Sequence, residues 1–335
     1  MKRVKAKVLL VIALLIAGTT EAQIDTPAYQ LVKKISLSGD GKWDYLKIDD
    51  EQKRLFVSHF DRVHVVDLNT GKQIGEIDSL NGVHGVALVK ALEKGYITNG
   101  TVNTVTVFDY NTFQVIKTIK VSGVKPDCVI FDKVSDKIYA FCGDSHSVSI
   151  IDPHTNTETG TIELGGKPEF AVPDDKGLIF NNLEDKNEVV VIDVKLAKIV
   201  RRYALKTGVA PTGITIDNST GRLFVACKES RNLLVLDAAT GNQVDELPIG
   251  GKVDGVVYEK ELKLIITSNG EGNASIIQQD GADSYKVIQT LQTRPGMKTL
   301  AYSGNTHQIF LSGAEIKDGT IQQGTFGVAV YGSAR

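Results

Sequence analysis

The sequence predicts an all-β protein, a seven-bladed β-propeller with four antiparallel strands in each blade, and two series of landmarks support this prediction. One series consists of aspartates that end a strand and lie 41 to 44 residues apart: Asp67, Asp109, Asp152, Asp193 and Asp237. The other marks the starts of short apolar strands, 40 to 44 residues apart: Asp44, His84, Asp127, Glu169, Thr212, Asp254 and Lys298. Four-stranded propeller blades repeat at about this length. Seven starts therefore indicate seven blades.

One complete unit can be followed from residue 107 to residue 152. Alternating or apolar runs at 114–121, 128–131, 138–142 and 148–151 are separated by turns rich in Gly, Asp, Asn and Pro, which is typical of strands and hairpins. Paired helical repeats can have a similar length, but these runs alternate with period two and are rich in β-branched residues. The unit is therefore expected to be an antiparallel sheet of four strands.

The two ends of the chain are expected to meet in one blade. Residues 29–37 (YQLVKKISL) resemble the fourth strand of the internal unit, residues 113–121 (FQVIKTIKV), and they precede the first complete unit. The last unit has predicted strands at 299–302, 308–312 and 326–331 but no fourth strand. An N-terminal strand that completes the last blade would close the ring without an exposed sheet edge.

Residues 1–22 are predicted to be a signal peptide. Four basic residues within the first seven precede an apolar run at 8–17, and the small-residue site Thr20-Glu21-Ala22 stands before Gln23. This order is typical of export signals. A retained anchor is the alternative, although the run is much shorter than the roughly 20 residues that span a membrane. We expect a mature chain, residues 23–335, that forms a single propeller domain outside the cytoplasm, either secreted or periplasmic.

The composition fits one globular body. The 335 residues are 42% hydrophobic and 23% charged, with a net charge of −2, a balance that argues against disorder and against a strongly basic nucleic-acid face. No linker or low-complexity segment divides residues 23–335. We therefore expect a monomer with no membrane span in the mature chain, and nucleic acid is not an expected partner.

Three cysteines are too few for a disulfide framework. Cys128 and Cys142 fall on consecutive predicted strands of one blade, almost symmetrically about the turn at 134–136. An oxidising compartment would permit a bridge between them, but directly opposed cysteines in an antiparallel pair are often poorly placed for one. Two buried free thiols are the alternative. Cys227 is expected to be a small buried apolar residue.

Four segments resemble a known family, the YncE-like seven-bladed β-propellers built from YVTN repeats. They are GYITNGTVNTVTVFD (95–109), IYAFCGDSHSVSIID (138–152), LGGKPEFAV (164–172) and RLFVACKESRNLLVLDAATG (222–241). The resemblance covers essentially the whole mature chain. It implies an extracytoplasmic propeller that binds a ligand, nucleic acid or protein partner more often than it catalyses a reaction. Blades six and seven depart from the pattern, at Ile277-Gln278 and in an inserted loop at 313–325.

The starts of the first strands point to a candidate binding site. In a propeller these strands line the central channel, and the loops that lead into them gather at one face. Loops on a rigid scaffold are the usual place for binding residues. The predicted ring around the channel mouth consists of Asp44, His84, Asp127, Glu169, Thr212, Asp254 and Lys298. Trp43, the only tryptophan, stands beside it as a stacking platform or as a packing residue between blades.

Four of the seven ring residues are carboxylates, and three interpretations stay open. Asp127, Glu169 and Asp254 with His84 could hold a divalent metal, because carboxylates suit Ca²⁺ or Mg²⁺ and an imidazole favours a transition metal. The carboxylates could instead cap the loops by accepting backbone N–H groups, with neighbouring lysines balancing their charge. A polar organic ligand is the third interpretation. No cofactor is predicted beyond such a metal.

The loops between second and third strands reach the same face and add further candidates, among them His59, His146, Glu184 and Lys228. Together with His84, the two histidines allow a histidine-rich metal site, although blades one to three place them in adjoining sectors. No nucleophile elbow, zinc-binding helix, Walker loop or dinucleotide-binding turn is present. The sequence therefore names no catalytic residue.

These observations favour a binding or scaffold propeller that engages a small ligand or a protein partner at the loop face around the channel mouth. The alternative from another class is a metal-dependent hydrolase or lyase, similar to propeller lactonases, with His84 as base or ligand beside the carboxylates. A third hypothesis is an adhesive or structural propeller whose loop face, with Trp43 and the insertion at 313–325, meets another protein.

Overall fold

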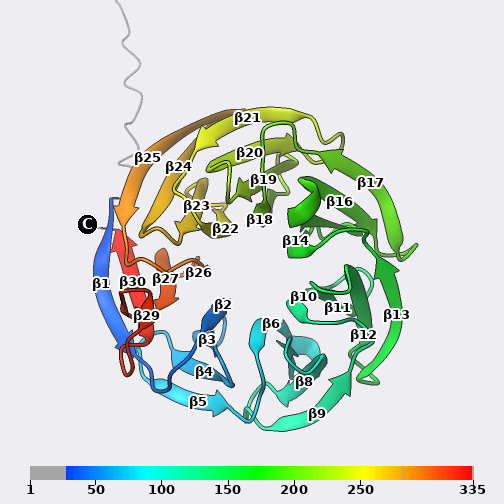
Figure 1. The fold of residues 1–335 in the computed structure, drawn as a ribbon, viewed down its shortest axis with the longest axis vertical. Helices are drawn as coiled ribbons and strands as arrows, with labels where there is room; N and C mark the ends of the chain where they lie inside the picture. The colour runs from blue at the N-terminus through cyan, green and yellow to red at the C-terminus, as the bar shows by residue number, and fades with distance from the viewer. Residues whose placement is uncertain (1–27, 282, 334–335) are drawn as a thin grey trace, which may run out of the picture.

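The computed structural model describes residues 28–281 and 283–333, and in this part the chain forms a ring of seven four-stranded antiparallel sheets (Figure 1). The helical segments within these residues are two 3-10 turns, Lys90–Leu92 and Glu184–Lys186. The predicted all-β, seven-bladed propeller is confirmed. The predicted signal peptide, residues 1–22, lies outside the described residues.

Each blade uses its strands in the same radial order. The first strands line the channel: β2 (Trp43–Asp49), β6 (Val83–Val89), β10 (Pro126–Asp132), β14 (Pro168–Pro173), β18 (Pro211–Asp217), β22 (Val253–Glu259) and β26 (Leu300–Ser303). The second strands are β3 (Arg54–His59), β7 (Lys94–Asn99), β11 (Lys137–Cys142), β15 (Leu178–Leu183), β19 (Arg222–Cys227), β23 (Leu264–Asn269) and β27 (Gln308–Gly313). The third strands are β4 (Arg62–Asp67), β8 (Thr104–Asp109), β12 (Ser147–Asp152), β16 (Glu188–Asp193), β20 (Asn232–Asp237), β24 (Asn273–Gly281) and β30 (Gly327–Ser333). The outer strands are β5 (Gln73–Ile77), β9 (Val115–Lys120), β13 (Thr157–Glu163), β17 (Lys198–Ala204), β21 (Gln243–Pro248), β25 (Ser284–Gln292) and β1 (Tyr29–Ser36).

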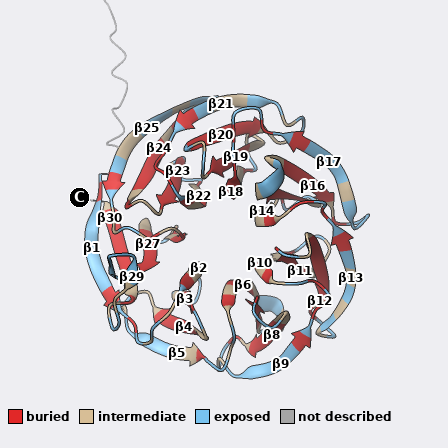
Figure 2. Ribbon diagram, in the orientation of Figure 1, coloured by how far each residue is buried: buried red, intermediate tan, exposed pale blue. Residues whose placement is uncertain are grey.

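The core lies between blades, because the second and third strands bury both of their faces while the outer strands expose one (Figure 2). Six of the seven second strands carry a buried aromatic residue at their third position: Phe56, Tyr96, Tyr139, Phe180, Phe224 and Phe310. Phe56 of blade one, for example, packs with Ile97 and Phe108 of blade two. Burial of such a ring contributes several kcal/mol, about 3–5 when it is truncated to Ala. Each aromatic side chain therefore fixes the angle between neighbouring blades.

The repeated aspartates at the ends of the third strands shape the turns that follow. In each of the five, Oδ1 accepts a hydrogen bond from the backbone N–H three residues later, as in Asp67 with Thr70 at 2.7 Å and Asp109 with Thr112 at 2.7 Å. The same bond occurs at Asp152, Asp193 and Asp237. In turns, the Asp carboxylate commonly accepts a hydrogen bond from a nearby backbone N–H group. The repeat therefore reflects local turn chemistry at the face opposite the channel mouth.

The ring closes through the two ends of the described chain. β1 pairs with β30 in an antiparallel ladder that runs from Tyr29 opposite Ser333 to Ser36 opposite Gly327. The seventh sheet has the order β1-β30-β27-β26, and Figure 1 shows β1 and β30 side by side. The expected completion of the last blade by the N-terminal strand is therefore observed.

The structure corrects one local expectation and decides between the two alternatives for Cys128 and Cys142. The insertion between β27 and β30 is not a plain loop, because it contains a short hairpin of β28 (Ile316–Lys317) and β29 (Thr320–Ile321). Cys128 does not face Cys142 across the ladder, because a bulge between Pro126 and Val129 shifts the register and sets Pro126 opposite Cys142. The three cysteines are buried free thiols.

Within residues 28–281 and 283–333, no helix has both the length and the apolar character that crossing a membrane would require.

Candidate functional site

The starts of the first strands meet around one cavity at the channel mouth. Six of the predicted ring residues, Asp44, His84, Asp127, Glu169, Asp254 and Lys298, line this cavity, whose volume is about 320 Å³. The carboxylates and His84 occupy the second position of their strands, where side chains face the channel. Thr212 shares that position but is buried, and its hydroxyl donates to the carbonyl oxygen of Val253 at 3.0 Å. We call this cavity the cup.

Two aromatic rings in contact with each other line the cup. Tyr45 of β2 and Phe170 of β14 each follow a ring carboxylate by one residue, and their centroids lie 4.5 Å apart. The two residues belong to blades one and four, so this contact spans the central channel. Sequence analysis did not identify either residue, since a contact across the ring has no local sequence signal.

Lysines surround the carboxylates at the rim. Lys125, Lys167 and Lys252 each precede a cup carboxylate by two residues, and Glu184 and Lys228 reach the cup from the loops between second and third strands. The side chains of the five cup carboxylates are 13–26% exposed, whereas the four cup lysines that form ion pairs are 37–42% exposed. Negative charge therefore lies deep in the cup and positive charge lies nearer the solvent.

Hydrogen bonds and ion pairs to the cup carboxylates come from side chains. Lys298 Nζ lies 2.5 Å from Asp254 Oδ2 and 3.5 Å from Asp44 Oδ1. Lys167 lies 2.9 Å from Glu169 Oε1. Glu184 accepts hydrogen bonds from both Lys167 and Lys228. Capping of backbone N–H groups, one of the three interpretations of the ring, is therefore not what these carboxylates do in the described structure.

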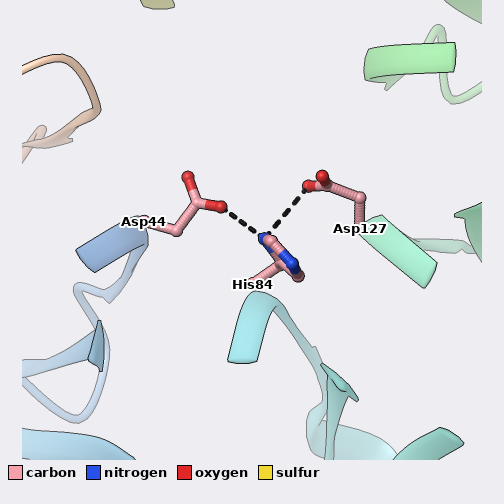
Figure 3. Close-up of side chains that lie close together, drawn as sticks. All are labelled: Asp44, His84 and Asp127. Atoms are coloured by element: carbon pink, nitrogen blue, oxygen red, sulfur yellow. Dashed lines mark hydrogen bonds and ion pairs between the residues drawn. The ribbon is translucent and has the colours of Figure 1, made fainter. Parts of the chain in front are cut away.

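His84 lies between two carboxylates (Figure 3). Its Nδ1 is 2.5 Å from Asp44 Oδ2 and 3.7 Å from Asp127 Oδ1. Burial lowers the pKa of His84, but the hydrogen bond that His84 donates to Asp44 and the charge of Asp127 outweigh it and raise that pKa overall. Burial likewise opposes ionisation of Asp44, yet Lys298 and His84 hold its pKa below the usual value. Asp44 and His84 therefore form an ion pair.

At three other cup carboxylates, the nearby cations do not offset the effect of burial on the pKa. Burial raises the pKa of Asp127 to about 6, and the charge of Asp44 adds to this effect. Burial, followed by repulsion from Asp127 and Asp254, raises the pKa of Glu169 to about 8. Burial also raises the pKa of Asp254. Burial in the cup therefore favours the neutral form of these three carboxyl groups.

Glu169→Gln is expected to stabilise the protein at alkaline pH. The pKa of Glu169 in the folded state, about 8, exceeds the ordinary value of 4.5, so its contribution to stability is complete below pH 4.5 and is lost as the pH rises through 8. Thermal unfolding should show a Tm for the variant that is higher by ~4 °C at pH 9 and little changed at pH 5. The exposed Glu163→Gln is the matched control. Equal shifts at both pH values would contradict the assignment.

One group of side chains in the cup has donor atoms that could surround a metal ion. Ligand atoms of Asp44, His84 and Asp127 lie within 4.8 Å of one another. Two of the predicted metal ligands, Glu169 and Asp254, are not in this group, and each is paired with a lysine. Lys298 beside Asp44 opposes a cation at the same point, since like charges repel at short range.

A second such group, Glu259, Glu261 and His307, lies on the opposite face. There the Glu259 carboxylate accepts hydrogen bonds from the backbone N–H groups of Glu261 and Leu262. That carboxylate thus has the same turn-forming role as the other strand-end acids.

Several predicted site residues lie elsewhere. Trp43 is buried between blades one and seven, where its Nε1 donates to the carbonyl oxygen of Gly296 at 3.1 Å and its ring contacts Phe326. This position matches the packing interpretation. His59 is also buried, stacked on Phe326, so it does not join His84. His146 does not line the cup. The described structure therefore brings no second histidine to His84.

Comparisons with known proteins bear on the fold alone. No known sequence family and no curated protein matches the chain. The chain is similar to a solved structure titled "Kuenenia stuttgartiensis Hydrazine Synthase", with a TM-score of 0.72, 16% identity, and coverage of 82% of this chain and 94% of that chain. It is also similar to a chain of the "Crystal Structure of Mitotic Checkpoint Complex", with a TM-score of 0.74, 12% identity and 99% of both chains covered. The protein is a seven-bladed β-propeller, a fold commonly used for binding or as a scaffold.

Proposed function

We propose that this chain is an exported binding protein that holds a small ligand in the cup at the channel mouth. The observation that carries this proposal is the cavity of about 320 Å³ at the channel mouth, where the Tyr45–Phe170 ring pair and converging charged side chains line one space. Concave sites with a few convergent polar groups are the usual ligand sites of proteins. Carboxylates with raised pKa values in such a cavity add support, since perturbed groups concentrate at functional sites.

Export and family membership belong to the same proposal. The layout of residues 1–22 supports a cleaved signal peptide, and three of the segments that resemble YVTN repeats coincide with the hairpins β7–β8, β11–β12 and β19–β20. We propose that the chain is a YncE-like propeller of the periplasm or the extracellular medium. Intact-mass measurement should give a chain that starts at Gln23 and is found outside the cytoplasm. A full-length chain in the cytoplasm would contradict export.

Ligand binding can be tested by thermal unfolding in the presence of a panel of small amines, carboxylates, amino acids and sugars. A ligand at 100 times its Kd stabilises a folded protein by ~2.7 kcal/mol, which corresponds to a rise in Tm of about 5 °C. We expect such a rise with at least one class of compound, and we expect the double variant Asp127→Asn/Glu169→Gln to lose it. A shift that persists in the variant would place the ligand outside the cup. No shift with any compound would favour a contact surface for another protein.

The grouping of Asp44, His84 and Asp127 supports a second candidate function, a metal-dependent hydrolase or lyase. Oxygen and imidazole ligands together suit a transition metal. Elemental analysis of protein purified without chelator should then find about one metal per chain, and His84→Gln should lose it while remaining folded. Metal-free protein that still gives the thermal shift would exclude this candidate and leave the binding function intact.

A further inference from the structure

The cup contains one carboxylate without a close ion-pair partner and one lysine that makes no ion pair among the described residues. Four of the cup carboxylates have a cationic nitrogen within 2.9 Å: Asp44, Glu169, Glu184 and Asp254. For Asp127, the nearest cationic partner is His84 at 3.7 Å. No hydrogen bond to the Asp127 carboxylate occurs among the described residues. Lys252 makes no ion pair within that part of the chain either, although its exposed side chain lines the cup. These two groups are free to meet the charges of a ligand.

The two groups lie on different sides of the cup. Asp127 belongs to β10 of blade three, and Lys252 immediately precedes β22 of blade six. Figure 1 shows β10 and β22 on opposite sides of the central channel. Blades four and five lie between them, and the two side chains form no ion pair with each other, so a ligand that bridges the cup would contact both.

The local backbone explains why the charges differ in depth. In two of the loops, a lysine stands two residues before an acid: Lys125-Pro126-Asp127 and Lys252-Val253-Asp254. Both lysines have a left-handed backbone conformation, with φ of 59° and 58°. This turn leaves the lysine at the rim, while the acid that follows enters the strand and faces the channel. A ligand therefore meets positive charge on the outside and negative charge inside.

The aromatic pair adds a preference for a cation in the cup. Tyr45 and Phe170 line the cup with Asp127, and the face of an aromatic ring attracts an ammonium group by ~0.5–2 kcal/mol. An organic ammonium ion gains from both the rings and the carboxylate. A ligand that is only a cation would leave Lys252 unpaired, and a ligand that is only an anion would meet the inner carboxylates.

We propose that the cup binds a small zwitterion, with its ammonium group at Asp127 near the Tyr45–Phe170 pair and its anionic group at Lys252 on the facing rim. This inference rests on the proposed binding function and assigns the chemical class of its ligand. The charge pattern sets the orientation of the ligand, because the reversed orientation would place each end beside a group of its own sign.

The test uses a matched series of probes on the full mature chain: 4-aminobutanoate, 6-aminohexanoate, N-acetyl-6-aminohexanoate, hexylamine and hexanoate. Binding is measured by isothermal titration calorimetry at low ionic strength and neutral pH. At least one of the two zwitterions should bind about 10-fold or more tightly than every probe that lacks one charge, because each lost charge-assisted contact costs roughly that factor. Asp127→Asn and Lys252→Gln should each weaken zwitterion binding by a similar factor.

The variants also separate the two ends of the ligand. Lys252→Gln should remove the advantage of 6-aminohexanoate over hexylamine, whereas Asp127→Asn should remove its advantage over hexanoate. Lys42→Gln is the matched control, because Lys42 also precedes a cup carboxylate by two residues but does not line the cup. It should bind as the parent protein does. Circular dichroism establishes that each variant is folded, and the analogue series tests the inference even without the variants.

The outcomes distinguish this inference from the function on which it rests. Equal affinity for hexylamine and 6-aminohexanoate, or zwitterion binding that Lys252→Gln leaves unchanged, would overturn the inference. If neither zwitterion binds but another class of compound in the thermal-unfolding panel raises the Tm, the inference is overturned and the binding function stands. Absence of any binding in either experiment would overturn both.

Discussion

The variant Gly327→Ala is expected to be strongly destabilised, because it forces apart the strand pair that closes the ring. A Cβ at this position would lie 2.2 Å from the carbonyl oxygen of Ile35 and 3.2 Å from its carbonyl carbon. Both atoms belong to the backbone of β1, which is bonded to β30 along the whole ladder. Relief therefore requires the strands to separate locally. We expect a loss of about 3 kcal/mol and a fall in Tm of roughly 5–10 °C in thermal unfolding followed by circular dichroism.

Gly332→Ala is the control within the same strand. A Cβ there would lie 3.4 Å from the Val32 side chain, which is an ordinary van der Waals distance, so its Tm should fall much less. An equal fall in both variants would show that glycine content, and not the contact with Ile35, sets the stability of β30. An unchanged Tm for Gly327→Ala would show that the β1–β30 pair contributes little to ring stability.

Acidification is expected to weaken the same closing region through two buried histidines. His59 is 1% exposed and stacks on Phe326 with ring centroids 3.7 Å apart, and its Nδ1 lies 3.3 Å from His64 Nε2. His59 Nε2 is buried without a hydrogen-bond partner among the described residues. Burial, the neighbouring His64 and the charge of Arg62 lower the pKa of His59 to about 4. The folded state therefore holds the imidazole neutral.

The sign of the pH effect follows from this shift. The folded-state pKa of His59 lies below the ordinary value of 6.5, so its contribution to stability is complete above pH 6.5 and is lost as the pH falls through 4. Between pH 7 and pH 4 the expected loss is about 3 kcal/mol. Burial also lowers the pKa of His64, although Glu76 opposes this change, so His64 acts in the same direction.

Urea unfolding at pH 7 and at pH 4 measures this loss. Other carboxyl groups titrate over the same range, so the informative quantity is the difference between the parent protein and His59→Phe, which retains an aromatic ring against Phe326. We expect the variant to lose less stability on acidification than the parent protein, by about 3 kcal/mol. Identical losses in both proteins would exclude His59 as the source.

Much of the fold follows from local sequence, because each blade is a local unit with its own turn signals. The aspartates at the ends of the third strands stand where a turn needs a hydrogen-bond acceptor, so their spacing marks the blades. The N-terminal strand was recognisable because residues 29–37 repeat the pattern of an outer strand. The positions of Asp44, His84 and Asp127 at the channel followed from the same repeat, because the second residue of a first strand faces inward.

Other features depend on geometry that one repeat does not contain. The Tyr45–Phe170 contact joins blades one and four, and it depends on the curvature of the ring. The choice between a Cys128–Cys142 bridge and two free thiols likewise depends on a bulge that shifts the register and that the sequence does not reveal. His59 occupies a position where no other blade has a histidine, and it stacks on Phe326 from the far end of the chain.

The closing strand pair also has a mechanical consequence. Tyr29 and Ser333 are direct partners at one end of the β1–β30 ladder, so a force that pulls these two residues apart would load a single hydrogen-bonded pair at a time. The ladder would open in sequence, as a zipper does, and at low force. A force between Ser36 and Ser333, by contrast, would act along the strands and load all the pairs together. The ring is therefore expected to resist tension strongly in one direction and weakly in the other.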